Sequence, residues 1–418
     1  MKTFPHRQTV LALAAAAASV LSATSAQAVD WGGYFRTGPG ATSKDSSRAC
    51  YGLSGQGMKY RLGNECDLYG EFLLSQGFKA DGVDYKAALM TNLFSPGSDT
   101  GAVDRGATGQ DAKNQSLDHS KLGINQIYVE GKGFDILPEG NFWIGKRFYG
   151  RADVHIVDTF FVNLSGVGAG VDSISVGSGK LAVAAFRTDG DNSTKPGSRF
   201  NLDFSEFAVN PGGKLRVTGT FVRGDFTGGT SGGGLSLQHN QENLFGLGGG
   251  NTLWVQYAQG AAGLDGGFGN LAASSNAKSW RIVESPTWQI GAFGGQGMLM
   301  FQQDKLDAPA GESTKVNSVS VGGRGSYALT KNFKLVGEAA YVQRKPDGGE
   351  TQKLAKVTFA PTLSTGPGFW NRPELRLYVT HAKWNLAANA ASGANGVTGI
   401  GDGKDTGTSY GAQVEIWF

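Results

Sequence analysis

The sequence has little of several features on which common protein classes depend. Among its 418 residues there are two cysteines and 12 prolines, which excludes disulfide-dense and collagen-like scaffolds. Charged residues make up 17% and the formal net charge is +3, so the chain lacks the positive excess that nucleic-acid binding requires. The mean hydropathy of −0.23 is too low for a bundle of membrane helices. Beyond the N-terminal region, no apolar run reaches the roughly 18 residues that a membrane helix needs.

The N-terminal region has the pattern of a secretory signal peptide. Lys2 and Arg7 precede the apolar run Val10–Leu21, which is too short to span a bilayer, and Ala26-Gln27-Ala28 fits a cleavage site. We therefore predict that residues 1–28 are removed and that one β-barrel domain occupies residues 29–418. The alternative is an N-terminal core helix.

A secreted chain folds in an oxidising compartment, which bears on its two cysteines. Cys50 and Cys66 have no histidine near them in the sequence, so a metal site is a poor explanation for the pair. We predict that they form a disulfide that closes a short loop.

What the chain has in abundance is two-residue alternation. In residues 374–380, for example, Leu375, Leu377 and Val379 alternate with polar or aromatic residues, and residues 214–223, 318–329 and 333–341 repeat the pattern. Alternation over about ten residues, many times over, is typical of a membrane β-barrel with a wet interior. A soluble β-sandwich also alternates, so this pattern alone leaves both folds open.

Three further features favour the barrel. Short turns such as Asn210-Pro211-Gly212-Gly213 and Thr330-Lys331-Asn332 alternate with longer stretches rich in small residues, the clearest being Gly228–Gly234 and Leu386–Lys404, which we expect to be long external loops. The chain ends in an alternating strand closed by Phe418, as bacterial outer-membrane barrels do. The 66 glycines and the low charge suit strands whose outer face meets lipid. The length allows about 16 to 18 strands.

One cluster of chemically active side chains stands out. Asp153, His155 and Asp158 place two carboxylates and an imidazole within six residues, which could ligate a metal or perform acid–base catalysis. No matching second group or nucleophile motif accompanies them. Gly177-Ser178-Gly179-Lys180 is an incomplete phosphate-loop pattern and is interpreted as a turn.

Several segments, in order from the first mature residue to the last, resemble maltoporins. The most specific lies around Gly145–His155 and continues through Ser165–Gly170, where maltoporins have an inward-folded loop. The others are Val29–Tyr34, Lys59–Cys66, Asn210–Gly213, Trp370–Pro373, Ala382–Trp384 and Gly411–Phe418.

This resemblance implies an all-β transmembrane antiparallel barrel of 18 strands with an inward-folded constriction loop, associated as a homotrimer with one sugar channel per subunit. In that family an aromatic path carries the apolar faces of the sugar and a polar path exchanges hydrogen bonds with its hydroxyls. By position, the aromatic path would use Tyr34, Tyr69, Phe160, Trp370 and Trp417. The polar path would use Arg36, Arg61, Glu71, Arg151, Asp153, His155 and Asp158. The alternatives for these residues are an interfacial girdle or barrel packing for the aromatics, and rim salt bridges for the polar residues.

The sequence also departs from the family pattern. Phe160 stands where maltoporins have the constriction tyrosine, and Ser95–Lys121 contains no tryptophan to lend to a neighbouring subunit. Three further family positions are altered, an aspartate at Asn163, a constriction arginine at Asn125 and the mid-path phenylalanine at Leu253, beside Trp254. We therefore expect a weaker or altered preference among oligosaccharides.

Together these features predict a bacterial outer-membrane channel for maltose and maltodextrin-type oligosaccharides. The alternatives are a channel for another disaccharide such as sucrose and a non-selective general diffusion porin. An outer-membrane hydrolase and a secreted adhesion protein are further alternatives from other classes. The expected partners are an oligosaccharide, the lipid bilayer with its lipopolysaccharide, and two further copies of the chain. We expect no prosthetic cofactor, no metal, no nucleic acid and no enzymatic activity.

Overall fold

The computed structural model describes residues 29–43, 49–95, 121–188, 194–307, 313–392, 397 and 404–418. The predicted signal peptide and most of Ser95–Lys121 lie outside the described residues. None of the described helices is long and apolar enough to cross a membrane.

Nearly all described residues belong to long strands joined by short connections. The strands are β1 (Asp30–Thr37), β2 (Gly40–Thr42), β3 (Leu68–Ala80), β4 (Val83–Ser95), β5 (Lys121–Lys132), β6 (Asn141–Arg147), β7 (Ala152–Val154), β8 (Thr159–Val162), β9 (Gly166–Val176), β10 (Gly179–Arg187), β11 (Gly197–Asn210), β12 (Gly213–Gly224), β13 (Ser231–Glu242), β14 (Gly250–Gly260), β15 (Lys278–Ile290), β16 (Phe293–Asp307), β17 (Ser313–Ala328), β18 (Phe333–Pro346), β19 (Gln352–Ser364), β20 (Glu374–Trp384) and β21 (Thr406–Trp417). The helical turns are η3 (His155–Val157), η5 (Leu244–Gly246) and α2 (Leu386–Ala391).

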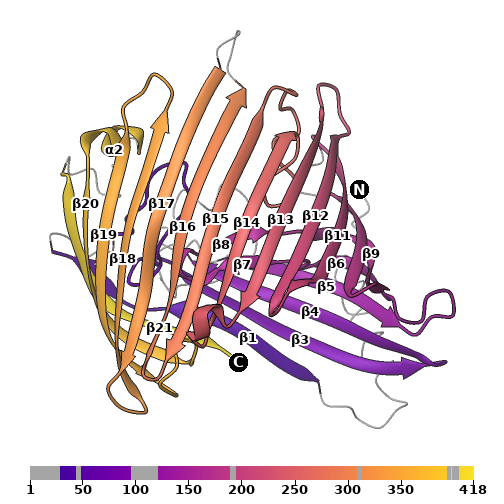
Figure 1. Cartoon of the computed structure of the whole chain (residues 1–418), viewed down its shortest axis with the longest axis horizontal. Helices are drawn as coiled ribbons and strands as arrows, with labels where there is room; N and C mark the ends of the chain where they lie inside the picture. Colours follow the sequence, from indigo (N-terminus) through magenta and orange to yellow (C-terminus); the bar gives the residue numbers. More distant parts are fainter. Residues whose placement is uncertain are drawn as a thin grey trace, which may run out of the picture.

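The strands close into a barrel. Each long strand pairs antiparallel with its neighbours along the chain, and β1 pairs with both β3 and β21, which joins the two ends of the sheet. The 19 segments of this sheet make 18 barrel strands, because β2 pairs with the same strand, β21, as β1 and so continues it. The short strands β7 and β8 form a separate hairpin, which lies behind the row β11–β19 in Figure 1. The predicted 18-stranded antiparallel barrel is confirmed.

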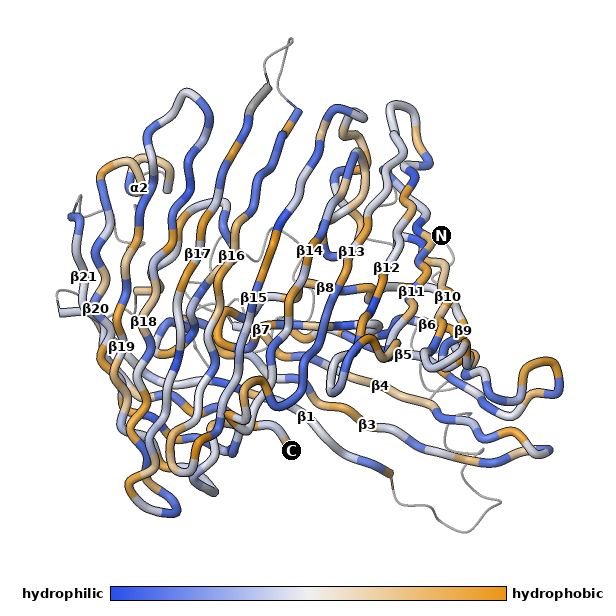
Figure 2. Tube along the Cα trace, in the orientation of Figure 1, coloured by the Kyte–Doolittle hydropathy of each residue, from blue (hydrophilic) through white to orange (hydrophobic). Residues whose placement is uncertain are grey.

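The two-residue alternation separates the inside of the barrel from the outside. On β17, Ser320 is fully buried whereas Val321 keeps 44% of its surface exposed. On β20, Leu375, Leu377 and Val379 are exposed and the residues between them are buried. Figure 2 shows the same alternation of hydrophobic and hydrophilic positions along the strands. This arrangement, with apolar residues outside and polar residues inside, is that of a barrel in lipid rather than of a sandwich with an apolar core.

The two rims differ in their connections. The rim that carries Val29 and Phe418 has two-residue turns in four of its hairpins, including the predicted turn at Pro211-Gly212, and the predicted turn before Phe333. Three longer connections, residues 133–140, 243–249 and 365–373, lie at the same rim. The prediction of a long loop at Gly228–Gly234 is wrong, because β13 begins at Ser231 and its glycines pair with β12 and β14. Glycine content marks a loop poorly here, since these strands also contain glycine. Residues 386–404 do form a long connection, which contains α2; part of it lies outside the described residues.

Two connections from the opposite rim fold into the barrel, and the main hydrophobic core lies between them and the inner wall. The first, residues 49–67, packs on β17–β20, where the Tyr60 hydroxyl is 2.9 Å from Ser320 Oγ. The second, residues 148–165, contains β7, η3 and β8 and packs on β11–β16, where Ile156 N donates to Gln296 at 3.2 Å. The two segments also pair with each other, because Arg61 N donates to Ile156 O at 2.9 Å. The predicted inward-folded loop is therefore confirmed.

The Ser165–Gly170 segment has a packing reason for its glycines. Inside the barrel, Trp143, Tyr149 and Phe186 form an aromatic cluster with ring centroids 4.9 to 6.1 Å apart. A Cβ atom on Gly168 would lie 2.8 Å from Phe186 Cδ1, so the ring can cover β9 only if this position has no side chain.

The lipid-facing surface of β15 contains a charged residue far from both ends of the strand. Glu284 is the central residue of β15, exposed, and in register between Leu253 and Leu299 on the neighbouring strands. Trp280 and Trp288 lie four residues away on either side, on the same outer face. This places the carboxylate near the middle of the apolar band, where charge is unfavourable.

Replacing this carboxylate should stabilise the barrel. We expect Glu284→Leu to raise the free energy of unfolding in lipid vesicles by about 1 to 2 kcal/mol, because the apolar side chain needs no hydration at that depth. The gain is limited because Asn251 Nδ2, 3.2 Å from the carboxylate, loses its acceptor. Denaturant unfolding followed by tryptophan fluorescence measures the change. Leu299→Glu on the adjacent strand should lower the stability, and an unchanged or lower stability of Glu284→Leu would contradict this placement.

Candidate functional site

The inserted segment 148–165 carries five of the predicted site residues, namely Arg151, Asp153, His155, Asp158 and Phe160. Its hairpin alternates, so that Val154, Ile156 and Phe161 are fully buried while Arg151 and Asp153 are exposed on the other face. The chain reverses at Asp158, which has a left-handed backbone conformation with a φ of 55° and closes η3. The buried side chains thus anchor the segment to the wall and direct its charged side chains away from it.

Cations and amides on the barrel wall hold the main chain of this segment. Arg199 donates to Leu164 O at 2.7 Å, and Arg281 donates to Phe161 O at 3.1 Å. Gln256 also donates to Phe161 O, at 2.6 Å. The sequence alone does not single out these residues as functional. Their inward register was visible in the strand pattern, but the carbonyl groups that they bind come from a distant segment.

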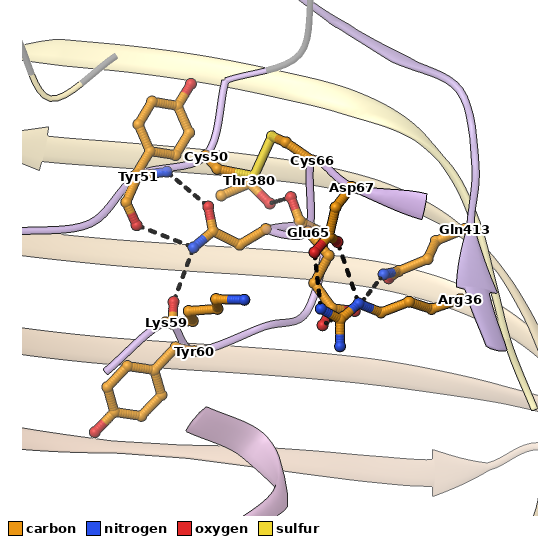
Figure 3. Close-up of a disulfide and its surroundings, with 12 residues drawn as sticks. Arg36, Cys50, Tyr51, Lys59, Tyr60, Glu65, Cys66, Asp67, Thr380 and Gln413 are labelled. Atoms are coloured by element: carbon orange, nitrogen blue, oxygen red, sulfur yellow. Dashed lines mark hydrogen bonds and ion pairs between the residues drawn. A yellow bond between two sulfur atoms is a disulfide. The ribbon is translucent and has the colours of Figure 1, made fainter. Parts of the chain in front are cut away.

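The inserted segment 49–67 is closed by the disulfide between Cys50 and Cys66, which confirms that prediction (Figure 3). Within the closed loop, Asn64 accepts from Tyr51 N at 2.7 Å and donates to Lys59 O at 2.8 Å. The Lys356 ammonium group on β19 donates to the same Lys59 carbonyl at 2.8 Å. The disulfide and these hydrogen bonds hold the segment against the wall in the conformation that presents Arg61.

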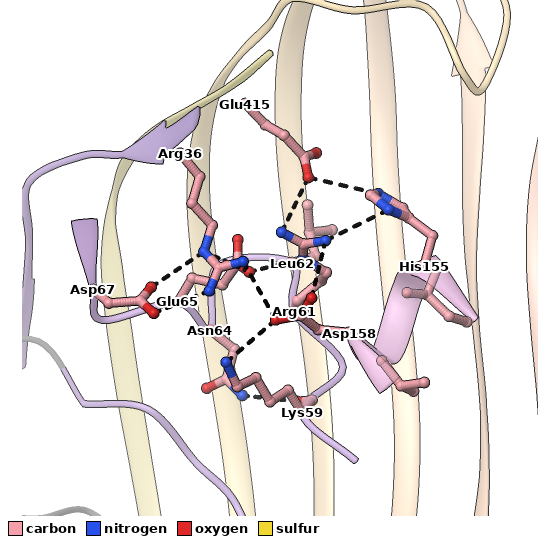
Figure 4. A network of polar contacts seen from close by, with 12 residues as sticks. Arg36, Lys59, Arg61, Leu62, Asn64, Glu65, Asp67, His155, Asp158 and Glu415 are labelled. Atoms are coloured by element: carbon pink, nitrogen blue, oxygen red, sulfur yellow. Dashed lines mark hydrogen bonds and ion pairs between the residues drawn. The ribbon is translucent and has the colours of Figure 1, made fainter. Parts of the chain in front are cut away.

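Arg36 and Arg61 lie in a buried network of ion pairs (Figure 4). Arg36 is 5% exposed and lies 2.9 Å from Asp67 and 3.1 Å from Glu65. Arg61 is 4% exposed and lies 2.7 Å from the same Glu65. Asp158 joins the network at 3.3 Å from Arg36. The network connects β1 and both inserted segments.

Glu415 on β21 is the centre of the second half of this network. Its carboxylate lies 3.2 Å from Arg61 and 3.1 Å from Arg372, and it also accepts from Arg376. His155 Nε2 lies 3.6 Å from the same carboxylate. Glu415 is fully buried, so these contacts replace the water that a carboxylate otherwise needs.

The charges around the inserted segment set the ionisation of its two central groups. Burial opposes ionisation of the Asp158 carboxyl, but Arg61, Arg36 and Lys59 outweigh it and lower its pKa to about 2. Burial of the His155 ring lowers its pKa well below the usual value, although Glu415 acts in the opposite direction. At neutral pH the segment therefore carries an ionised Asp158 and a neutral His155.

The predicted aromatic residues come together on adjacent elements. Trp417 on β21 and Tyr34 on β1 are direct cross-strand partners, and the Tyr34 ring is 6.3 Å from that of Tyr69 on β3. The His155 ring lies 5.5 Å from Trp370 and 5.6 Å from Trp417. Trp370 and Trp417 keep 43% and 38% of their surface exposed. The result is a series of rings that continues from one segment of the chain to the next.

Phe160 has a defined place beside Arg151. The Arg151 guanidinium carbon lies 3.9 Å from the centroid of the Phe160 ring and 4.0 Å from that of Phe148, so the guanidinium is sandwiched between two rings. Two aromatic faces restrict the rotamers of a side chain that is otherwise exposed. At the position of the family's constriction tyrosine, Phe160 therefore lacks the hydroxyl, and its ring packs against Arg151.

The departures at Asn125 and Leu253 also have a defined place. Asn125 donates to Glu71 at 2.8 Å and to the Tyr69 hydroxyl at 3.1 Å, so it joins the predicted site residues of β3. Leu253 has outward register. Trp254 points inward, but the Phe161 ring lies 5.3 Å away and leaves it 2% exposed. Among the described residues, the inner face of β14 therefore contributes no exposed ring to the channel.

No group of three or more histidine, cysteine, aspartate or glutamate side chains among the described residues could hold a metal ion. Asp153, His155 and Asp158 instead point to different neighbours. His155 and Asp158 contact the buried network, whereas Asp153 is exposed. Although Asp153, His155 and Asp158 are close in the sequence, their side chains do not converge on one site.

Comparison with known proteins decides the family. The LamB porin family model matches residues 29–418, the whole predicted mature chain. The chain belongs to the LamB porin family. This is the maltoporin family, as the sequence segments indicated.

Solved structures with the same fold include a BenF-like porin from Pseudomonas fluorescens Pf-5, with a TM-score of 0.54 and 10% identity, covering 94% of this chain and 99% of that chain. OccAB1 of Acinetobacter baumannii has a TM-score of 0.52 and 11% identity, covering 93% of this chain and 96% of that chain. At these identities the likeness concerns the fold alone. Membership of the LamB porin family, with the closed barrel, identifies a multi-pass outer-membrane channel and argues against the hydrolase and adhesion alternatives.

The neutral His155 makes the stability of this LamB porin depend on pH. In the folded state its pKa is lowered, so the unfolded chain binds the proton first as the pH falls below about 6.5. The free energy of unfolding should therefore decrease below that pH, with a slope approaching about 1.4 kcal/mol per pH unit. Burial lowers the pKa of His155, and the positive charges of Arg61, Arg324 and Arg372 lower it further, whereas the negative charge of Glu415 raises it.

Denaturant unfolding at pH 7.5, 6.5 and 5.5 measures this slope. We expect His155→Gln to reduce the slope, since glutamine has no proton to gain. His381→Gln, on the exposed outer face of β20, removes an imidazole without touching the network and serves as the control. An equal slope in wild type and His155→Gln would contradict the assignment.

Proposed function

We propose that the channel conducts maltose and maltodextrin-type oligosaccharides along Trp370, Trp417, Tyr34 and Tyr69. The observation that carries this proposal is the series of partly exposed rings on adjacent elements, with hydrogen-bonding groups beside each ring. A pyranose ring has apolar C–H faces that pack on aromatic rings and hydroxyls around its edge. Each contact is weak and is repeated, so a sugar can enter and still leave.

Under this proposal the polar residues divide into two groups. Arg151, Asp153 and Glu71 are exposed or half-buried and would bind sugar hydroxyls directly. Arg36 and Arg61 are almost fully buried in ion pairs and would hold the inserted segments in place. His155 packs edge-on against both tryptophans and would orient them. Asp158 pairs with Arg36 but stays partly exposed, so it would both hold the inserted segment and contact sugar hydroxyls.

Altered specificity is the second candidate. Phe160 lacks a hydroxyl and Asn125 lacks a charge, so the site offers fewer donors than the family pattern, which favours a disaccharide other than maltose, such as sucrose. We further propose that three copies of the chain associate. A heat-modifiable trimer that requires detergent would support this, and a monomer under the same conditions would oppose it.

The test is ion conductance through single channels in a planar bilayer, titrated with maltose, longer maltodextrins and sucrose. Saturable block that deepens with maltodextrin length would support the first proposal. Block by sucrose alone would move the specificity to that sugar. Open conductance without block by any of these sugars would contradict both and indicate a general diffusion porin.

A further inference from the structure

The outer face of the barrel carries a set of lysines at the strand ends of the rim opposite Val29 and Phe418. In bacterial outer-membrane barrels the short turns face the periplasm, so this is the extracellular rim. Six of these lysines have outward register, one on each of six consecutive strands, and we call them the lysine belt. Its members are Lys278 (β15), Lys305 (β16), Lys315 (β17), Lys345 (β18), Lys353 (β19) and Lys383 (β20).

Three members of the belt stand in one row. Lys278 is the direct cross-strand partner of Lys305, and Lys305 is the direct partner of Lys315. Directly opposite side chains on one face have Cβ atoms only about 5 Å apart, and like charges at that distance repel. A row of this kind is unfavourable in the isolated barrel and becomes favourable when an anion lies across it.

Within the described part of the chain, no carboxylate neutralises the belt by an ion pair. None of the six lysines forms an ion pair with another described residue, and five of them are exposed, Lys305 being half-buried. Asp307, at the end of β16, accepts from Ser274 N and Oγ, each at 2.5 Å. By contrast, Arg187 and Arg223, farther round the same rim, both pair with Asp225. The anion for the belt must therefore come from outside the described part of the chain.

The depth of the belt indicates which anion this is. Trp280 lies two residues below Lys278 on the same outer face, and Tyr257 lies opposite Trp280. Tyr341 lies four residues below Lys345 on β18. Aromatic residues mark the boundary between lipid tails and headgroups, so the ammonium groups beyond them lie at headgroup level.

The belt covers only part of the circumference. At the same ends of β3, β4 and β5 the outward side chains are Leu68, Leu93 and Leu122. A barrel that needed only a general attraction to anionic lipid would not confine its cations to one side. The apolar side suits contact with protein or lipid tails, and the belt suits contact with phosphate.

We propose that the lysine belt binds the phosphate groups of lipopolysaccharide, the phosphorylated glycolipid of the outer leaflet, in place of the divalent cations that otherwise bridge them. A glycolipid with two phosphates can contact several ammonium groups of the row at once, and this relieves the repulsion between Lys278, Lys305 and Lys315. Charge-assisted contacts of this kind are strong at a membrane surface. The proposal is independent of which sugar the channel conducts.

The test measures binding of diphosphoryl lipid A to the mature protein, purified in detergent and stripped of co-purified lipopolysaccharide with EDTA present. We expect the triple variant Lys278→Gln, Lys305→Gln, Lys315→Gln to bind at least about tenfold more weakly. The same three positions changed to arginine should bind within about threefold of wild type. Monophosphoryl lipid A and phosphatidylglycerol should bind wild type more weakly than diphosphoryl lipid A.

The matched control removes three lysines from the periplasmic rim, Lys180→Gln, Lys214→Gln and Lys331→Gln, with the same loss of charge. This control should bind as wild type does. Heat-modified migration and single-channel conductance establish that each variant folds. Equal weakening in both triple variants would show that net charge alone acts, and unchanged binding in the belt variant would overturn the proposal. Phosphatidylglycerol that binds as tightly as diphosphoryl lipid A would also overturn it.

Discussion

Replacing Glu415 with glutamine should lower the free energy of unfolding by about 3 to 5 kcal/mol, the cost of leaving buried charges without their partner. The carboxylate lies 3.2 Å from Arg61 and 3.1 Å from Arg372 and accepts from Arg376. All three arginines are buried with it. Glutamine keeps the size of the side chain but removes the charge. Denaturant unfolding in lipid vesicles measures the loss.

The control is Glu350→Gln, in the exposed connection after β18, which makes the same change in charge without buried partners. We expect it to alter stability by less than about 0.5 kcal/mol. The Glu415 variant should also show noisier single-channel current, because Arg61 belongs to the inserted segment 49–67 and loses one of its anchors. Glu374 also lies 3.1 Å from Arg372 and pairs with Arg376. A loss of stability no larger than that of the control would mean that Glu65 and Glu374 are sufficient partners for the arginines.

Replacing Trp417 with alanine should weaken block of the channel by maltodextrins roughly tenfold, while sugar-free conductance persists. Pairs of aromatic rings gain about 0.5 to 1.5 kcal/mol beyond their buried area, we take a ring on a pyranose face to gain a similar amount, and about 1.4 kcal/mol corresponds to a factor of ten. Trp417 has this effect because it joins Trp370, through His155, to its cross-strand partner Tyr34. Titration of current block gives the half-saturation concentration directly.

Trp280→Ala is the matched control, since Trp280 has outward register on β15 and faces lipid. It should leave the half-saturation concentration within about twofold of wild type. If Trp417→Ala shows the same affinity as this control, the aromatic path does not carry the sugar. If the wild-type channel shows no block by sugar, the proposed function itself fails. This outcome can be distinguished from the first, in which the wild-type channel is blocked but Trp417→Ala has no effect.

Strand positions and their two faces could be predicted from the sequence because each depends on neighbouring residues only. In residues 374–380, Leu375, Leu377 and Val379 face lipid as their alternation indicated. The disulfide between Cys50 and Cys66 was predictable because there are no other cysteines in the chain. The prediction failed at Gly228–Gly234, where glycine content indicated a loop although the segment enters β13.

The candidate site could be predicted as a set of residues but not as an arrangement. The resemblance to maltoporins supplied Tyr34, Tyr69, Trp370 and Trp417, and the structure shows which of their rings are neighbours. The resemblance could not show that Arg36 is buried against Asp67 and Glu65. Whether a charged side chain faces water or a partner depends on segments far away in the chain.

The sequence alone therefore determines that this chain is an outer-membrane barrel, where its clearest alternating strands run and which side of those strands meets lipid, because alternation and turns act locally. The folded barrel determines the rest. It brings His155 between Trp370 and Trp417, places Glu415 among three arginines and aligns Lys278, Lys305 and Lys315 in one row. These arrangements depend on strand register and on how two inserted segments pack against the wall, and both follow from contacts between residues that are distant in the sequence.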